Sequence, residues 1–273
     1  KIGCWNGYKV NTKECLKMIK KYNKAYNEYD NYQKETAKLL YLHETWMGES
    51  TDSLDQEYTY NIIESVMTNN YTEYNNIFNN NKFERPINQN KLWNKLSSLN
   101  NTFNYVFDRD KPLLFTLNNC MKIHTSIMEN VEPNKAGIIR TINVRPSGSV
   151  LRRQYKEPEY IEKSLEVLFN WTRKVYNNLK SLSDKILLSS LFFYEFLDIH
   201  PFSNGNGRTA RILLNLLLQN DVSIPFSLYL RTDNKGRQDY IEVIEDCYFN
   251  SPSQLASYIL TSSYRFTHNI NDL

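Results

Sequence analysis

The sequence predicts an all-α protein with one short β-hairpin. Apolar residues recur at spacings of three and four through most of the chain, only 8 of the 273 residues are glycine, and a single segment alternates apolar and polar residues. Hydrophobic residues make up 41% of the chain, which is enough to build the core of one large or two small domains.

The N-terminal part predicts two helical regions and then a loop. Spacings of three and four over about 12–46 predict one or two amphipathic helices, and Gly48 ends this pattern. A second helical pattern covers about 54–66. Residues 68–90 are polar and Asn-rich, so we expect a long loop or a poorly ordered insertion there.

The rest of the chain predicts further helices and one hairpin. Residues 138–150, IIRTINVRPSGSV, alternate apolar and polar residues and break at Pro-Ser-Gly, which is typical of a β-hairpin. The remaining helical patterns cover about 91–108, 112–131, 158–180, 184–199, 206–220, 236–249 and 252–267.

Charge and cysteine content narrow the possible functions. The net charge is +3, from 33 basic and 30 acidic residues without a basic run, which argues against nucleic acid as a partner but leaves a local anion site open. Cys4, Cys15, Cys120 and Cys247 lack metal-ligand spacing, so we expect reduced thiols.

The sequence says little about location. No apolar stretch reaches the ~18 residues that cross a bilayer, so we expect no membrane segment in this chain. The chain begins at Lys1 and not at Met, and we therefore expect a trimmed or processed form. A cytoplasmic protein and a delivered or secreted effector both stay open, as does a targeting segment upstream of Lys1.

One stretch, HPFSNGNGRTAR at residues 200–211, predicts a functional loop. His200 precedes a proline, which disfavours helical backbone at the histidine, so the preceding helix should stop there. Phe202 is the only large apolar group of the loop and should anchor it to the core. Gly205 and Gly207 then lie at a helix N-terminus, where backbone N–H groups can converge on an anion.

Two arginines extend the same site. Arg208 and Arg211 are three residues apart and therefore share one face of the first turn. Positive side chains at a helix N-terminus are unfavourable unless an anion binds there. The stretch therefore predicts a site for phosphate groups.

This stretch resembles the signature of Fic-domain proteins, His-x-Phe-x-Asp/Glu-Gly-Asn-Gly-Arg-x-x-Arg. The positions that match are His200, Phe202, Gly205, Asn206, Gly207, Arg208 and Arg211. Upstream, IHTSIMENVEPNKAGIIRTINVRPSGSV is similar to the helix, Ala-Gly turn and hairpin flap of the family. The resemblance implies a Fic-type helical core over residues 105–273, preceded by an N-terminal helical region over residues 1–104.

The resemblance also implies an activity, the transfer of AMP from ATP, with Mg²⁺, to a Ser, Thr or Tyr hydroxyl of a target protein. His200 would be the general base. Gly205 and Gly207 would offer backbone amides to the phosphates, and Asn206 would bind the α-phosphate. Arg208 and Arg211 would hold the leaving phosphates, because their two positive charges stabilise the negative charge on these groups.

Two further regions acquire roles through the resemblance. The flap would dock the target segment by strand addition, and its residues are Thr141, Ile142, Asn143, Val144 and Arg145. Tyr240 matches a position that contacts adenine in the family, while a core aromatic is the other interpretation of this residue.

One position departs from the signature. Asn204 stands where the family has an acid that holds Mg²⁺. An amide oxygen can ligate Mg²⁺ but brings no negative charge, and this cation prefers carboxylates with phosphates. Weaker metal binding, weak catalysis and a donor other than ATP are the three consequences that follow, and we favour the first.

Residues 43–51, HETWMGEST, resemble the inhibitory motif Ser/Thr-x-x-x-Glu-Gly/Asn of many Fic proteins, with Thr45, Glu49 and Ser50 at its fixed positions. The resemblance implies an inhibitory helix over about 36–50 whose glutamate pairs with Arg211 and excludes a phosphate. The same glutamate would also position water for removal of AMP.

Alternative functions stay open from the sequence. One is transfer of another group, such as UMP, phosphocholine or phosphate, and another is a nucleotide-binding regulator with weak turnover because of Asn204. The family offers Hsp70-type chaperones and small GTPases as targets, and nothing in the sequence chooses between them. A homodimer also stays open.

Overall fold

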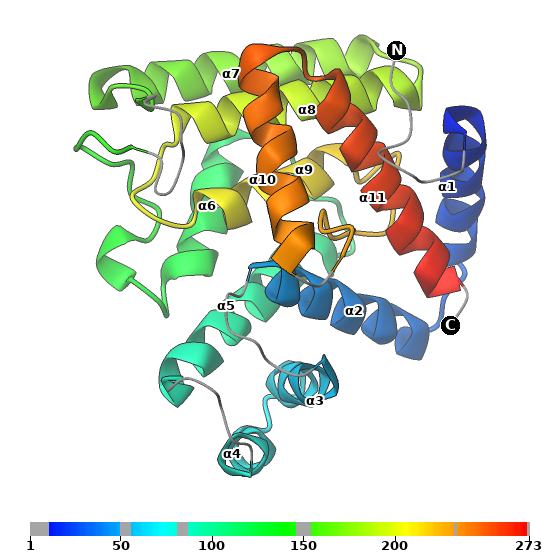
Figure 1. The fold of residues 1–273 in the computed structure, drawn as a ribbon, viewed down its shortest axis with the longest axis vertical. Coiled ribbons are helices and arrows are strands. Elements are labelled where there is room, and N and C mark those ends of the chain that lie inside the picture. The colour runs from blue at the N-terminus through cyan, green and yellow to red at the C-terminus, as the bar shows by residue number, and fades with distance from the viewer. Residues whose placement is uncertain (1–10, 50–55, 81–86, 146–153, 232–233, 272–273) are drawn as a thin grey trace.

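The structure is a computed structural model that describes residues 11–49, 56–80, 87–145, 154–231 and 234–271. The all-α prediction is confirmed, because helices account for the regular structure of these residues apart from one short 3₁₀ turn (Figure 1). In chain order the helices are α1 Thr12–Tyr26, α2 Asn31–Glu49, α3 Gln56–Met67, α4 Tyr71–Asn79, α5 Gln89–Phe107, α6 Leu117–Met128, the 3₁₀ turn η1 Pro133–Lys135, α7 Pro158–Asn178, α8 Leu182–Ile199, α9 Asn206–Leu218, α10 Asn234–Phe249 and α11 Ser253–Asn271.

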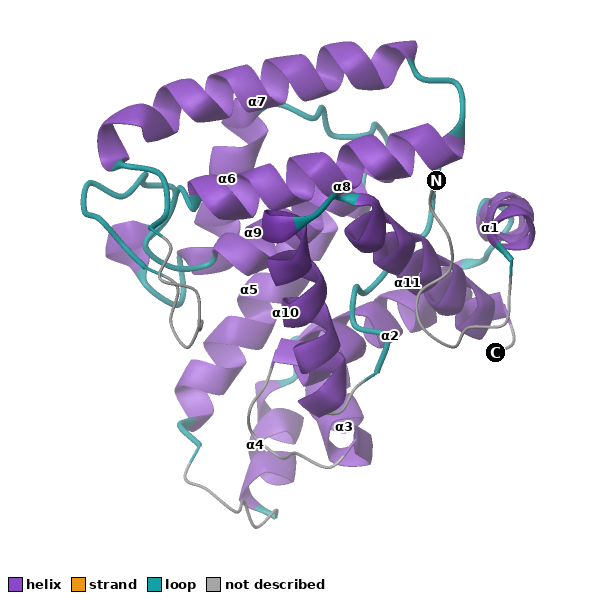
Figure 2. Cartoon of the chain, turned by 45° about the horizontal axis from the view of Figure 1, so that its top comes forward, coloured by secondary structure: helices purple, strands orange, loops and turns teal. Residues whose placement is uncertain are grey.

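The most buried helix is α9. Nearly all of its residues are buried, because it packs against α8, α6 and α5 (Figure 2). Its Leu-rich sequence ILLNLLL is apolar on every side, as a helix at the centre of a bundle requires. The loop that precedes α9 is therefore attached to the most buried helix of the described residues.

The two ends of the described chain meet. α1 packs against α11, and α2 packs against α10, so N-terminal helices lie beside C-terminal ones (Figure 1). In α1, Asn11 caps the helix by accepting a hydrogen bond from the Glu14 N–H, and Cys15, Ile19 and Tyr22 form its buried face. The N-terminal region thus contributes to one continuous core with the later helices.

The Asn-rich stretch contains a helix where the sequence analysis expects a loop, so that expectation is wrong for residues 71–79. Asn70 is the N-cap and its side chain accepts from the Glu73 N–H. Tyr74 is fully buried against Trp93 of α5, with ring centroids 4.8 Å apart. Aromatic contacts with α5 therefore stabilise this helix, although its asparagine-rich sequence is typical of a loop.

The predicted hairpin is not seen in the residues that can be examined. Residues 138–145 form no strand, and residues 146–150 lie outside the described part of the chain. The backbone carbonyl of Ile142 accepts a hydrogen bond from the side chain of Arg140. The predicted domain boundary after residue 104 stays a prediction, and α5 runs through it without a break.

Two findings concern what the described residues lack. None of the helices placed in the structure combines the length and the apolar character needed to span a bilayer. The predicted thiols Cys15, Cys120 and Cys247 are buried and form no disulfide in the described part of the chain, and Cys4 lies outside the described residues.

Candidate functional site

The predicted loop joins α8 to α9. α8 ends at Ile199, and His200 is its C-cap with φ 50° and ψ 61°, in the left-handed region. The His200 N–H still donates to the Phe196 carbonyl at 3.1 Å. Left-handed backbone is unfavourable for a residue with a side chain, so contacts around His200 must hold this conformation.

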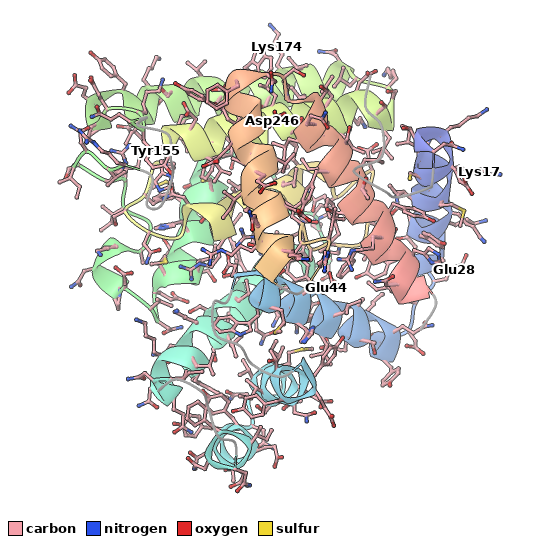
Figure 3. The ribbon with its side chains drawn as sticks, viewed as in Figure 1. Lys17, Glu28, Glu44, Tyr155, Lys174 and Asp246 are labelled. Carbon is pink, nitrogen blue, oxygen red and sulfur yellow. The ribbon has the colours of Figure 1, made fainter. Side chains whose placement is uncertain are left out.

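The imidazole of His200 has two neighbours that fix its orientation. Its Nδ1 lies 3.3 Å from the Leu197 carbonyl oxygen, which can only accept, so Nδ1 carries the proton and Nε2 is the basic nitrogen. The ring of Tyr155 stacks on it, with centroids 3.9 Å apart and planes 11° apart. Tyr155 lies near the start of α7 (Figure 3).

Arg140 connects the loop with the segment that was expected to form the flap. Its Nε donates to the His200 carbonyl at 2.7 Å, and its Nη1 donates to the Ile142 carbonyl at 2.6 Å. Its Nη2 donates to the carbonyls of Lys156 and Ile199. The side chain is buried, so these carbonyls replace water around the guanidinium. Arg140 thus ties the end of α8 to both sides of the flap segment.

Phe202 and Asn206 close the loop. Phe202 is fully buried, as an anchor requires. The Asn206 side chain accepts from the Phe202 N–H at 3.0 Å and donates to the Phe202 carbonyl at 2.7 Å. Both polar atoms of Asn206 are thereby committed to the loop, and its predicted contact with an α-phosphate stays a prediction.

His124 of α6 contacts the loop through the face of its ring and through its Nε2 atom. Its Nδ1 accepts from the Gly137 N–H at 2.9 Å, so Nε2 must carry the proton and donate to the Asn204 carbonyl at 3.0 Å. The ring is fully buried and stacks on Phe202, with centroids 3.6 Å apart. Burial lowers the pKa of His124 to about 4, so the imidazole is neutral at physiological pH.

The amino terminus of α9 has the features of an anion site. Gly205 is the N-cap with φ 79°, and no side chain caps this helix. A methyl group at Gly205 would approach Met128 Sδ to 2.9 Å and His124 Nε2 to 3.2 Å, so glycine is required for the backbone angle and for the space. The first backbone N–H groups of a helix have no carbonyl partner within it, which leaves them available to a ligand.

The two arginines lie differently. Arg208 is partly exposed and its Nη2 approaches Met128 Sδ at 3.5 Å. Arg211 is buried, and its guanidinium lies 5.3 Å from the centre of the Tyr229 ring and 5.8 Å from that of Tyr240. Glu49, the last residue of α2, forms an ion pair with Arg211. The structure therefore brings together the two residues that the resemblance pairs.

α2 packs closely enough to place Glu49 at this site. A methyl group on Gly48 would lie 2.1 Å from Cγ of Tyr229, so only glycine permits this approach. Thr45 is buried and its hydroxyl bonds to the Tyr41 side chain. Glu44, labelled in Figure 3 where α2 meets α10, forms a second ion pair with Arg265 of α11.

The remaining predicted residues lie as follows. The flap residues Thr141, Ile142, Asn143 and Arg145 are exposed and Val144 is partly exposed. Tyr240 is buried, with its hydroxyl 3.4 Å from Arg211 Nη1, so its ring belongs to the core beside the arginine. Its contact with adenine stays a prediction.

Asn204 donates from Nδ2 to Oε1 of Glu132, which lies just before η1. Its Oδ1 accepts from the Gly205 N–H at 2.7 Å. Within the described residues there is no group of three or more His, Cys, Asp and Glu side chains that could hold a metal ion. A cation at this loop would therefore depend on the oxygens of a nucleotide as well as on those of the protein.

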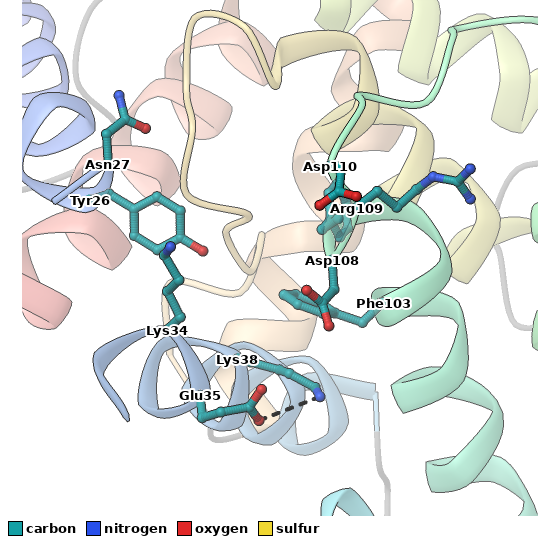
Figure 4. A pocket seen from close by; sticks show the side chains of 10 residues that line it. Tyr26, Asn27, Lys34, Glu35, Lys38, Phe103, Asp108, Arg109 and Asp110 are labelled. Atoms are coloured by element: carbon teal, nitrogen blue, oxygen red, sulfur yellow. Dashed lines mark ion pairs between the residues drawn. The ribbon is translucent and has the colours of Figure 1, made fainter. Parts of the chain in front are cut away.

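A separate cavity of about 490 Å³ lies at the other end of α2 (Figure 4). Among the residues that line it are three from α2 and three that follow α5, namely Lys34, Glu35, Lys38, Asp108, Arg109 and Asp110. None of the residues predicted from the sequence lines this cavity. It is thus distinct from the loop that carries His200.

Sequence reasoning missed four residues that the structure places at the loop, namely His124, Glu132, Arg140 and Tyr155. Arg140, Glu132 and His124 lie 60 to 80 positions in the sequence from the loop residues that they contact. The one available signal was that His124, Glu132 and Arg140 fall within the segment that resembles the family upstream of the loop.

Comparison with known proteins agrees with this geometry. The model of the Fic/DOC family matches residues 114–218. Protein adenylyltransferase fic-1 of Caenorhabditis elegans is 32% identical over 118 residues, which are 43% of this chain and 22% of that protein. Protein adenylyltransferase Fic of Nematostella vectensis is 28% identical over 153 residues, 55% of this chain and 33% of that protein. The chain thus covers a third or less of these curated relatives.

A solved structure extends the likeness beyond the matched segment. The structure of Fic-1 from C. elegans superposes with a TM-score of 0.71 and 17% identity, and it covers 96% of this chain and 72% of that one. At this identity the likeness concerns the fold, including the helices that precede the matched segment. Residues 114–218, which hold the loop and both arginines, match the Fic/DOC family, and this part of the chain is therefore a Fic/DOC domain.

Proposed function

We propose that this protein is an adenylyltransferase that moves AMP from ATP to a Ser, Thr or Tyr hydroxyl of a target protein, and that Glu49 restrains it. The observation that carries the proposal is that His200, the uncapped start of α9 and Arg211 lie within residues 200–211, with Glu49 paired to Arg211. The names of the relatives support the same activity.

In the proposed reaction the target hydroxyl oxygen attacks the α-phosphorus of ATP. Its proton passes to Nε2 of His200, the nitrogen that the Leu197 contact leaves basic. The bond from the α-phosphorus to the bridging oxygen breaks, and pyrophosphate leaves with the electron pair. The backbone N–H of Gly207 and the guanidinium of Arg208 stabilise the charge that develops on the phosphates, and the N–H of Gly205 joins them when it leaves Asn204 Oδ1.

Glu49 restrains the reaction through competition. A carboxylate paired with Arg211 occupies the position that an anionic phosphate would take. ATP binds fully only when this pair opens, because one guanidinium face cannot serve both anions. We also propose that Glu49 could orient water for removal of AMP from a modified target.

Mg²⁺, when bound with ATP, would neutralise part of the phosphate charge. The exposed flap residues 141–145 are the proposed docking site for the target backbone, and a chaperone and a small GTPase are both retained as targets. Oligomeric state does not enter this proposal.

The test is a labelling assay with α-labelled ATP, Mg²⁺ and cell lysate as the source of targets. We expect Glu49→Gly and Glu49→Gln to raise incorporation into protein, and His200→Ala to abolish it in either background. Glu28→Gly, at an exposed position between α1 and α2, is the matched control and should behave as the unaltered chain. A Glu49→Gly protein that labels nothing would exclude the proposal, and the mass added to a labelled target distinguishes AMP from UMP, phosphocholine or phosphate.

A second candidate is a nucleotide-binding regulator with little turnover. It is favoured by Asn204, whose Oδ1 is already bonded to the Gly205 N–H. It predicts calorimetric binding of ATP without transfer even in Glu49→Gly, and recovery of transfer in Asn204→Asp. Transfer by Glu49→Gly with Asn204 intact would reject this candidate.

A further inference from the structure

The amide of Asn204 meets a carboxylate. Its Nδ2 donates to Oε1 of Glu132, which lies 72 positions earlier in the chain. Asn204 and Glu132 therefore form one polar unit at the start of α9, although the sequence separates them widely. This unit contains the negative charge that Asn204 alone does not have.

Asn204 by itself is poorly prepared to hold a cation. Its side-chain oxygen accepts from the Gly205 N–H, and its backbone carbonyl accepts from His124 Nε2. Both of its oxygens are thus already engaged with protein donors. An incoming Mg²⁺ would have to compete for them, and a neutral amide offers little in return.

Glu132 is held in place by its own segment. Its N–H donates to the Met128 carbonyl at 2.7 Å, and its carbonyl accepts from the Lys135 N–H at 2.9 Å. Lys135 Nζ binds the other carboxylate oxygen, Oε2. The Glu132 side chain is 30% exposed and that of Lys135 is 52% exposed, so the lysine is a solvent-facing counter-ion that can be displaced.

From these contacts we propose that Glu132 is the carboxylate ligand of Mg²⁺ in the complex with ATP, acting beside Asn204. This inference rests on the proposed function, since it assigns a metal ligand to the same nucleotide site. It assigns the acidic role to a residue outside the signature loop. In this interpretation, the carboxylate comes from the segment before η1 and lies beside Asn204 through their hydrogen bond.

The chemistry of Glu132 fits this role. Mg²⁺ is bound in proteins through one or two carboxylates together with phosphate oxygens and water, and a carboxylate has about four acceptor positions. The hydrogen bonds from Lys135 and Asn204 lower the pKa of Glu132, so the group is ionised at neutral pH. The metal would therefore not have to displace a proton.

The position of Glu132 relative to the phosphate site also fits. Its charge interacts with that of Arg208, the partly exposed arginine expected to hold phosphate. The Glu132 carboxylate lies near this guanidinium and would repel a phosphate that binds there without a metal ion. A divalent cation between the carboxylate and the phosphate converts this repulsion into attraction.

Calorimetry of ATP binding tests the proposal without any measurement of activity. ATP is titrated into the full chain carrying Glu49→Gly, once with Mg²⁺ and once with EDTA, and the ratio of the two affinities is the Mg²⁺ gain. We expect Glu132→Gln to reduce this gain at least about tenfold, the lower end of the loss on removing a partner of a metal site. Binding in EDTA should not weaken, because the amide oxygen of the substituted side chain still accepts from Asn204.

Two matched variants complete the experiment. Glu129→Gln removes the same charge from an exposed position at the end of α6, in the segment that leads to Glu132, and should leave the gain unchanged. The double variant Glu132→Gln with Asn204→Asp has its carboxylate at position 204 instead of 132. It should restore the Mg²⁺ gain in ATP affinity. Thermal melting of each variant confirms that it is folded, and Lys135→Gln should keep the gain, because the lysine only neutralises the unoccupied carboxylate.

An undiminished gain in folded Glu132→Gln overturns the proposal, as does an equal loss in Glu129→Gln or in Lys135→Gln. The labelling assay is separate. If labelling occurs but the gain is independent of Glu132, the function stands and this inference fails. If the gain depends on Glu132 but no protein is labelled, the metal ligand stands and adenylyl transfer fails.

Discussion

Glu49 at the end of α2 is ion-paired with Arg211 in α9, and the Arg211 guanidinium also lies over the rings of Tyr229 and Tyr240. The arginine is buried, whereas 26% of the glutamate side chain is exposed. The pair is therefore open to solvent mainly on the glutamate side.

Removing the carboxylate of Glu49 should destabilise the protein, and ATP binding should stabilise the variant more than the unaltered chain. Glu49→Gln leaves a buried guanidinium without its carboxylate, and we expect a loss of about 2 kcal/mol, below the ~3–5 kcal/mol of a fully buried pair. ATP should then raise the melting temperature more in this variant than in the unaltered chain. Equal shifts in the two proteins, measured by calorimetry at one ATP concentration, would show that Glu49 and ATP do not compete.

Gly48→Ala should move α2 away from Tyr229. Alanine in a helix is ordinarily more stable than glycine by about 1 kcal/mol, but here its methyl group would lie 2.1 Å from the ring carbon, Cγ. We expect a net loss of about 1–3 kcal/mol, as for overpacked cores, together with more labelling by ATP. Lys34→Ala on the same helix serves as control, and a stabilised Gly48→Ala protein would contradict the close contact.

Arg140 should affect the base as well as the fold. Arg140→Lys keeps the charge but cannot reach the carbonyls of His200, Ile142 and Lys156 together, so we expect a loss of about 3 kcal/mol in urea unfolding. It should also lower the maximal rate of transfer more than it raises the KM for ATP, because His200 loses its fixed orientation. A change in KM alone would assign Arg140 to binding.

Stability should fall in mild acid because of His124. Its pKa is about 4 in the folded protein and about 6.5 in the unfolded chain, so below pH 6.5 the unfolded chain binds the extra proton. The neutral histidine's contribution is complete above pH 6.5 and is lost as the pH falls towards 4, by about 3 kcal/mol in total. Urea unfolding at several pH values should give a flatter profile for His124→Gln, whereas parallel profiles would exclude this origin.

The sequence predicted those parts of the site that are local in the chain. His200, the glycine turn and the two arginines follow from one stretch, because a proline, a helix start and a spacing of three act over a few residues. Glu49 was reached only through a resemblance, since no periodicity relates α2 to α9. Its ion pair with Arg211 joins segments that the chain itself keeps far apart.

The predictions of a loop at residues 71–79 and of a hairpin near residue 140 were wrong because tertiary contacts override the local sequence preference there. Residues 71–79 are polar and rich in asparagine, yet Tyr74 packs on Trp93 and the segment is a helix. Around residue 140 the alternation predicted paired strands, but residues 138–145 form no strand, and the buried side chain of Arg140 binds the Ile142 carbonyl and the carbonyls of His200, Lys156 and Ile199. The hydrogen bond between Asn204 and Glu132 was not predicted, because the two residues lie 72 positions apart in the sequence.

The ion pair between Glu44 and Arg265 has a consequence for where regulation resides. Both Nη atoms of Arg265 donate to the Glu44 carboxylate, and Nη2 also donates to the carbonyl of Tyr229, the residue against which Gly48 packs. The two partners lie 221 positions apart in the sequence. A substitution of Arg265 in the last helix is therefore expected to loosen the packing of α2, which carries Glu49, although Arg265 does not form the ion pair with Arg211. Variants with increased labelling should be sought in α11 as well as in α2.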